Sequence, residues 1–188
     1  RGYFAVHTWI ATKEQGADYY QVHEVTGWRT YVVNSRPGDP DRHWYGARPE
    51  LYADIRGEKA AALIPQIYQA VENYPYPTQY EAWPGPNSNT FVAWVIRETP
   101  DFDVALPSHA IGKDYLGDRL IAPSPGGAGY QLSLGGYFGV LAGVREGLEV
   151  NILGLSLGIN PMALGIKLPG LGELALLDTN PMHEQPAR

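Results

Sequence analysis

The chain has 188 residues, a formal net charge of −6 and no cysteine, and 18% of its residues are charged. This length suits one domain with a sizeable core, or one domain with an extension. The acidic balance argues against a nucleic-acid partner, and the lack of cysteine excludes disulfides, a thiol nucleophile and a zinc–thiolate cluster.

The first part of the chain predicts a β-hairpin. Alternating side chains favour strands at residues 2–11 and 19–25, with a turn between them. If the turn is centred near Gln15, antiparallel pairing places His7 directly opposite His23 on the same face of the sheet.

Further extended segments follow this hairpin. Residues 30–34 predict a third strand, and residues 35–41, which contain Pro37, predict an exposed loop. Two more extended pieces are expected at residues 43–46 and 51–55. The first part of the chain is therefore predicted to be mainly β-structure.

Two helices are predicted next. Residues 58–74 have helical apolar spacing, but Pro65 cannot lie deep inside a regular helix, so the helix either starts late or is kinked there. A second helix is expected to begin at Asn87-Ser88 and to run to about Glu98.

The last third of the chain predicts glycine-rich strands. Residues 106–118 favour a loop in which Lys113 and Asp114 are ordinary surface charges. From residue 122, apolar residues alternate with Gly, Ser and Asn, which indicates strands. Three turns are expected to join them, at Gly135-Gly136, Asn160-Pro161 and Pro169-Gly170.

Strands of this kind can lie flat on a partner or on another sheet. The uncharged stretch at residues 150–166 is too interrupted by polar residues and glycine to form a membrane-spanning helix. The polar residues 179–188 predict a flexible tail.

Ser88 is the first candidate for chemistry. It lies at the predicted start of the second helix, where unpaired N–H groups and the helix dipole favour developing negative charge. Its hydroxyl either caps the helix, as Asn87 also could, or serves as a nucleophile. The second interpretation requires a base elsewhere in the chain.

His7 is the predicted base. A base of this kind needs a third polar group to orient it, and either His23 or Glu24 on the neighbouring strand meets that need. We prefer His23 because it shares the predicted face with His7. The predicted catalytic residues are therefore Ser88, His7 and His23.

A metal site is the rival use of the histidines. His7, His23 and His43, with Glu24 or Asp54, offer nitrogen and oxygen ligands, but no His-x-x-x-His spacing supports such a site. The sequence predicts neither a metal nor a cofactor.

Aromatic residues offer a binding groove as an alternative to core packing. The residues concerned are Trp9, Trp28, Trp44, Tyr45, Trp83 and Trp94. We interpret most of them as core residues. The predicted binding residues are Asn87, Asn89, Trp9 and Trp83.

The order of these elements resembles a known superfamily over residues 1–100. A strand with His, a neighbouring polar strand and a helix that opens with Asn-x-x-x-Phe resemble the circularly permuted papain-like proteins, which include the lecithin:retinol acyltransferase relatives. In those proteins a Cys nucleophile follows the Asn, whereas Ser88 follows Asn87 here. A serine needs a base within about 2.6–3.2 Å, so His7 would have to reach it.

The chain also resembles the bacterial family called domain of unknown function 3750. The motifs that carry this resemblance are His7-Thr8-Trp9, Gly85-Pro86-Asn87-Ser88-Asn89-Thr90-Phe91, Ala110-Ile111-Gly112-Lys113-Asp114-Tyr115 and Glu146-Gly147-Leu148-Glu149-Val150-Asn151. The resemblance implies a bacterial protein of the cell envelope, periplasmic or membrane-associated through an N-terminal segment that precedes Arg1. It implies no established activity.

Together these observations predict an α+β fold. A permuted papain-like domain is expected at residues 1–120, a Gly-rich β extension packed on it at 121–178, and a tail at 179–188. The expected function is a serine-dependent hydrolase or acyltransferase acting on amide or ester bonds of envelope material. The alternative is a non-catalytic envelope scaffold or binding module that uses the extension as its interaction surface. The expected partners are an envelope small molecule, lipid or peptidoglycan ligand, and a protein bound through residues 123–178.

Overall fold

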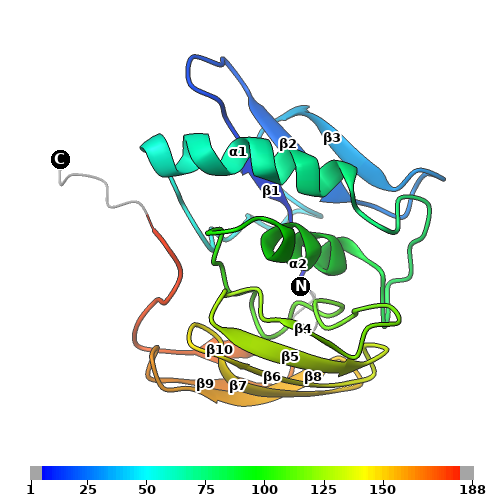
Figure 1. Ribbon diagram of the computed structural model, residues 1–188, viewed down its shortest axis with the longest axis vertical. Coiled ribbons are helices and arrows are strands. Elements are labelled where there is room, and N and C mark those ends of the chain that lie inside the picture. Colours follow the sequence, from blue (N-terminus) through cyan, green and yellow to red (C-terminus); the bar gives the residue numbers. More distant parts are fainter. Residues whose placement is uncertain (1–5, 183–188) are drawn as a thin grey trace.

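The computed structural model describes residues 6–182, and this part of the chain has an α+β architecture with two antiparallel sheets (Figure 1). The helices are α1 (Gly57–Glu72) and α2 (Ser88–Glu98). The strands are β1 (Ile10–Thr12), β2 (Tyr20–Val25), β3 (Val33–Gly38), β4 (Ile121–Pro123), β5 (Gly129–Leu134), β6 (Phe138–Gly143), β7 (Gly147–Ile152), β8 (Leu155–Asn160), β9 (Gly165–Leu168) and β10 (Gly172–Leu174). Strands β1–β3 and α1 form one end of the molecule, β4–β10 form the other end, and α2 lies between them (Figure 1).

The three-stranded sheet differs in register from the predicted hairpin. Its order is β1-β2-β3, and Ile10, not His7, lies opposite His23. The first strand is only three residues long, and residues 6–9 lie outside it. The predicted pairing of His7 with His23 is wrong because the turn is centred further along the chain than Gln15. Residues 2–5 of the predicted strand lie outside the described residues.

Strand β3 extends beyond the predicted third strand. It ends at Gly38 and includes Pro37, in a segment that the sequence assigned to a loop. Proline is tolerated there because β3 is an edge strand and needs no hydrogen bond on its outer side. The extended pieces expected at residues 43–46 and 51–55 form no strand, apart from an isolated bridge between Trp44 and Ala47.

Helix α1 contains Pro65 in its interior, so the prediction of a late start at this residue is wrong. Proline cannot donate the backbone hydrogen bond that the carbonyl of Ala61 would normally accept. Both residues are exposed, so water can hydrogen-bond this carbonyl.

The main hydrophobic core lies between the three-stranded sheet and the two helices. Val25 of β2 and Phe91 and Val95 of α2 are fully buried, and Leu63 and Ile67 of α1 cover them. Helix α2 ends at Glu98 as predicted, just before Thr99-Pro100. Because its apolar residues are buried on several sides, α2 is a fixed support for its own N-terminus.

The glycine-rich segment forms a seven-stranded sheet with the order β10-β9-β8-β7-β6-β5-β4. All these strands lie between residues 121 and 174, within the predicted extension, and turns occur at the three predicted places. The face toward α2 is polar. The buried polar side chains of its strands are Gln131, Ser133, Glu149, Asn151, Ser156, Asn160 and Lys167.

An ion cluster lies between this polar face and the rest of the chain. The Glu149 carboxylate accepts hydrogen bonds from Lys113 and, at 2.8 Å, from Lys167. Asp114 accepts hydrogen bonds from Gln131 and Asn151. Lys113 and Asp114 are buried, so their prediction as surface charges is wrong. They form the polar contact between the sheet and the rest of the chain.

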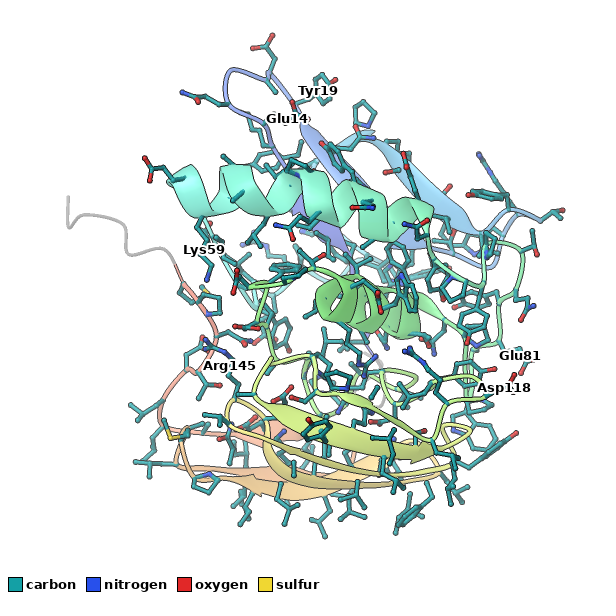
Figure 2. The ribbon with its side chains drawn as sticks, in the orientation of Figure 1. Glu14, Tyr19, Lys59, Glu81, Asp118 and Arg145 are labelled. Carbon is teal, nitrogen blue, oxygen red and sulfur yellow. The ribbon has the colours of Figure 1, made fainter. Side chains whose placement is uncertain are left out.

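The opposite face of the sheet, here called the outer face, is apolar, and all its residues are exposed except Val140, Val150 and Leu168, which are half-buried. Its residues are Ile121, Tyr130, Leu132, Leu134, Phe138, Val140, Ala142, Leu148, Val150, Ile152, Leu155, Leu157, Ile159, Ile166, Leu168 and Leu174. Figure 2 shows their carbon-rich side chains projecting away from the molecule below the sheet. Antiparallel sheets usually bury an apolar face and expose a polar one, and this sheet does the reverse.

A search of the described helices found none that combines the length and the apolar composition needed to span a bilayer.

Candidate active site

The N-terminus of α2 is capped by Asn87 and not by Ser88. The Asn87 side chain accepts hydrogen bonds from the backbone N–H groups of Asn89, at 2.9 Å, and Thr90, at 3.2 Å. The Thr90 hydroxyl in turn accepts from the Asn87 N–H at 3.1 Å, which completes a capping box. The Ser88 hydroxyl is therefore not needed as a cap.

Buried hydrogen bonds tie this helix start to its neighbours. The Asn89 amide donates to the carbonyls of Val6 at 2.9 Å and Ile111 at 2.8 Å. The Asn87 amide also donates to the Ile111 carbonyl, at 3.0 Å. Gly112 permits this approach, because it has a φ of +94° and a Cβ there would lie 2.3 Å from the Asn87 amide nitrogen. Asn87 and Asn89, predicted as binding residues, are both nearly fully buried and hold the start of α2 in place, and both also line the cleft that contains Ser88.

His7 is held by a buried carboxylate and an aromatic ring. Its Nε2 lies 3.2 Å from Oε2 of Glu24. Its ring stacks on Trp44 with centroids 3.9 Å apart and an interplanar angle of 7°. Because Nε2 faces Glu24, Nδ1 is the ring nitrogen left for a proton from another group.

Glu24 is oriented by two arginines as well as by His7. Arg42 Nη2 donates to Oε2 at 2.5 Å, and Arg36 Nη2 donates to Oε1 at 3.4 Å. Burial by itself raises the pKa of Glu24, but the hydrogen bond with His7 and the charge of Arg42 outweigh it and lower the pKa below its usual value. Glu24 is therefore ionised at neutral pH and can orient an imidazole.

His23 has a separate set of partners. Its Nε2 lies 3.1 Å from the Thr12 hydroxyl, and its Nδ1 is hydrogen-bonded to Ser35. The choice of His23 as the residue that orients His7 is therefore wrong. Glu24, the alternative drawn from the sequence, is the group that contacts His7.

His7 and Ser88 lie in the same region of the molecule. Both line one open cleft of about 2560 Å³. The residues that follow each of them are in contact, since the Thr8 hydroxyl donates to Oδ1 of Asn89 at 2.9 Å. No hydrogen bond joins His7 to Ser88 within residues 6–182. The fold brings the candidate base and nucleophile to one cleft without a direct contact between them.

Aromatic rings line much of the same cleft. The rings that line it include Trp9, Trp28, Trp44, Tyr45 and Trp83. Trp28 and Tyr45 are exposed, and Trp28 stacks on Trp44 with centroids 5.5 Å apart. Trp94 instead packs against the core. The interpretation of most of these aromatics as core residues is therefore wrong. Trp9 and Trp83, predicted as binding residues, are among those that line the cleft.

Comparison with known proteins identifies the family. A family model described as "Protein of unknown function (DUF3750)" matches residues 1–115. The chain belongs to the DUF3750 family. This match confirms the family resemblance for the part with β1–β3, α1 and α2, whereas the motif at residues 146–151 and the seven-stranded sheet lie beyond it. Searches among the curated proteins and the solved structures found no match.

The DUF3750 chain offers no clear metal centre in its described part. Among residues 6–182, no group of three or more His, Asp or Glu side chains is arranged to hold a metal ion. His7 and His23, two members of the rival metal set, engage different partners.

Sequence reasoning missed Arg42 and Trp44 as parts of the DUF3750 site. Trp44 stacks on His7, and the Arg42 guanidinium lies 4.7 Å from the centroid of the Trp9 ring. Both residues lie in a segment without regular strands, so no periodic pattern could place them. The sequence offered one signal only. If Glu24 on β2 is buried, its charge requires a basic partner, but nothing in the sequence says which one.

The buried His23 predicts a pH-dependent stability for this DUF3750 protein. Burial lowers the pKa of His23 from 6.5 to about 4. The unfolded chain binds a proton there below about pH 6.5, while the folded chain stays neutral. The free energy of unfolding should therefore fall by about 3 kcal/mol between pH 6.5 and pH 4 through this residue.

Urea unfolding between pH 7 and pH 4.5 measures this effect. We expect His23→Gln to be less stable than the wild type at pH 7 but to lose less stability as the pH falls. The exposed His43 provides the control, and His43→Gln should keep the wild-type slope. Equal slopes for His23→Gln and the wild type would contradict the prediction.

Proposed function

We propose that this DUF3750 protein is a serine-dependent hydrolase or acyltransferase that acts on amide or ester bonds of cell-envelope material. The supporting observation is the pairing of His7 with the buried carboxylate of Glu24, in the cleft that Ser88 also lines. A hydroxyl at a helix N-terminus, an imidazole and an orienting carboxylate are the groups that nucleophilic acyl transfer needs. The first 100 residues are proposed to form a permuted papain-like arrangement with Ser in place of Cys.

In the proposed reaction, Ser88 Oγ attacks the carbonyl carbon of the substrate and its proton passes to Nδ1 of His7. The protonated His7 then donates that proton to the departing alcohol or amine, which leaves an acyl group on Ser88. Water completes hydrolysis, and an acceptor alcohol or amine completes acyl transfer. In either case His7 takes a proton from the incoming water, alcohol or amine as that group attacks the acyl carbon. The bond between the acyl group and Ser88 Oγ then breaks, and His7 returns the proton to Ser88 Oγ.

The start of α2 offers one donor for the developing oxyanion. The N–H groups of Asn89 and Thr90 are already bonded to the Asn87 side chain. The N–H of Ser88 bonds to no other residue in the described part of the chain. This N–H, together with the positive end of the helix dipole, would stabilise negative charge on the substrate oxygen. Because the hydroxyl and imidazole are not hydrogen-bonded, substrate binding must bring them together.

The cleft fits a substrate larger than a single small metabolite. Pockets for small ligands usually measure about 300–1,000 Å³, and this cleft measures about 2560 Å³. The exposed rings of Trp28, Tyr45 and Trp83 offer flat surfaces along it. An extended acylated molecule of the bacterial envelope, where we propose that the protein resides, matches such a cleft.

A fluorophosphonate probe tests the role of Ser88. The wild type should form a covalent adduct, and Ser88→Ala should lower the labelling rate by about 10³-fold or more because the attacking oxygen is lost. Ser124→Ala is the matched control, since Ser124 is buried, directly follows β4 and does not line the cleft. Equal labelling of the wild type and Ser88→Ala would disprove the proposal.

Ser88→Cys provides a second readout from the same position. The natural chain has no cysteine, so iodoacetamide would react with a single thiol in this variant. We expect the pH profile of alkylation to report a thiol pKa below the usual value of about 8.5, because the helix N-terminus and His7 stabilise a thiolate. A thiol pKa at or above that value would contradict an activated site.

A binding module is the second candidate function. It is favoured by the outer face of the seven-stranded sheet, whose exposed residues are all apolar. A monomeric protein rarely exposes an apolar patch larger than about 300–600 Å². This function does not depend on Ser88 or His7.

A further inference from the structure

We infer that the outer face of the seven-stranded sheet binds the same face of a second copy of this chain, which forms a two-fold symmetric dimer. This inference rests on the second proposed function and names its partner. It requires no chemistry at Ser88.

The register of the sheet makes the outer face continuous. Tyr130, Ala142, Leu148, Ile159, Ile166 and Leu174 form one row across six strands. A second row consists of Ile121, Leu132, Val140, Val150 and Leu157. A third row consists of Leu134, Phe138, Ile152 and Leu155. None of the three rows contains a charged residue.

The sheet cannot turn its apolar face inward and its polar face outward. Glu149 and Gln131 point inward and are bonded to Lys113, Asp114 and Arg97 of the same chain. Lys167 also points inward and is bonded to Glu149. A one-residue slip would move these charges to the other side of the sheet. The apolar side chains therefore stay on the outer face, where no residue among 6–182 covers them.

The size of the outer face matches what a stable dimer needs. Four strands of six residues and three shorter ones, about 4.8 Å apart, cover roughly 550 Å² of flat surface. Apolar side chains in the adjoining turns, at Leu153, Leu164 and Leu171, are also exposed. The total approaches the roughly 800 Å² that each partner contributes to a standard interface. Two such faces would pack about 10 Å apart as a β-sandwich.

Charge favours a second copy over a lipid surface. Peripheral membrane-binding surfaces usually combine apolar residues with Lys and Arg that attract anionic headgroups. The outer face has no basic residue in its described strands, and the chain carries a net charge of −6. A flat, uncharged face is complementary to itself under a two-fold axis. The edge strands β4 and β10 are only three residues long, which disfavours edge-to-edge growth of the sheet.

Sedimentation velocity of the full chain from about 1 to 100 µM, without detergent, tests the inference. The wild type should sediment as a dimer. Leu157→Lys should weaken dimerisation by at least about 100-fold, because the two-fold axis brings two added ammonium groups into one apolar interface. Leu157 is 57% exposed, so the monomer should remain folded. Leu132→Lys, on another strand, provides an independent variant.

Tyr19→Lys is the matched control. Tyr19 is 56% exposed and lies on the β1–β2 hairpin, at the end of the molecule opposite the sheet (Figure 2). This variant should remain dimeric. A monomeric wild type, species larger than a dimer, or a dimer that both outer-face variants retain would each overturn the inference.

Vesicles distinguish a lipid partner from a second copy. The wild type is incubated with phosphatidylcholine vesicles, with and without phosphatidylglycerol, and centrifuged. A wild-type monomer that sediments with vesicles, and loses this property in Leu157→Lys, would replace the dimer with a lipid-binding function. A monomer that binds no vesicles would count against both the dimer and the binding-module function. Neither result would change the labelling expected at Ser88.

Discussion

Replacing Glu149 by Ala should destabilise the folded protein by about 3–5 kcal/mol. The carboxylate is 1% exposed and hydrogen-bonded to Lys113 and Lys167, which are themselves buried. Burial by itself raises the pKa of Glu149, but the charges of the two lysines outweigh it and lower the pKa below its usual value. Removing the carboxylate leaves two ammonium groups without their central counter-ion, and breaking such a buried pair carries a cost of this size.

Urea unfolding at pH 7 measures the loss, and an exposed ion pair provides the control. Arg56 donates three hydrogen bonds to Asp54, at 2.9–3.2 Å. Its side chain is 52% exposed, so solvent screens the interaction. Asp54→Ala should therefore shift the urea midpoint much less than Glu149→Ala. Similar shifts for the two variants would show that burial of the Glu149 cluster does not determine its contribution.

Glu24→Gln should slow fluorophosphonate labelling of Ser88 by about 10²–10⁴-fold. In serine proteases the matching change, from carboxylate to amide, lowers kcat about 10⁴-fold because the imidazole is held in the wrong tautomer. Here the carboxylate faces Nε2 of His7, so an amide at this position would no longer fix Nδ1 as the proton acceptor. The measurement is the labelling rate of protein that circular dichroism shows to be folded.

Arg36→Gln separates orientation of His7 from general damage to the network. Arg36 also contacts Glu24, at 3.4 Å, but its side chain is 63% exposed and it leaves the contact between His7 and Glu24 intact. We expect this variant to label at nearly the wild-type rate. If Arg36→Gln and Glu24→Gln lose labelling equally, Glu24 acts through the stability of the network and not through His7.

The start and end of α2 could be predicted from the sequence because local chemistry determines them. Asn87 and Thr90 form a capping box, and Thr99-Pro100 ends the helix. The side-chain contacts around the start of this helix were harder to predict from the sequence. The pairing of His7 with Glu24 depends on the hairpin register, and a turn placed too early in the chain selected His23 instead.

The presence of strands in the last third of the chain could also be predicted, but the direction of burial could not. Period-two alternation places Leu157 and Ser156 on opposite faces without saying which face is inside. The usual preference for apolar burial gives the wrong answer here, because Ser156 is buried and Leu157 is exposed. The deciding interactions join Lys113 to Glu149, 36 residues apart, and no local pattern in the sequence reveals them.

The family match stops at residue 115, yet the charged side chains just before that boundary are hydrogen-bonded by side chains beyond it. Lys113 bonds to Glu149, and Asp114 bonds to Gln131 and Asn151. A cut at the boundary would divide an electrostatic cluster and not a linker. A chimera that replaces the seven-stranded sheet with that of another family member must therefore also replace residues 113 and 114.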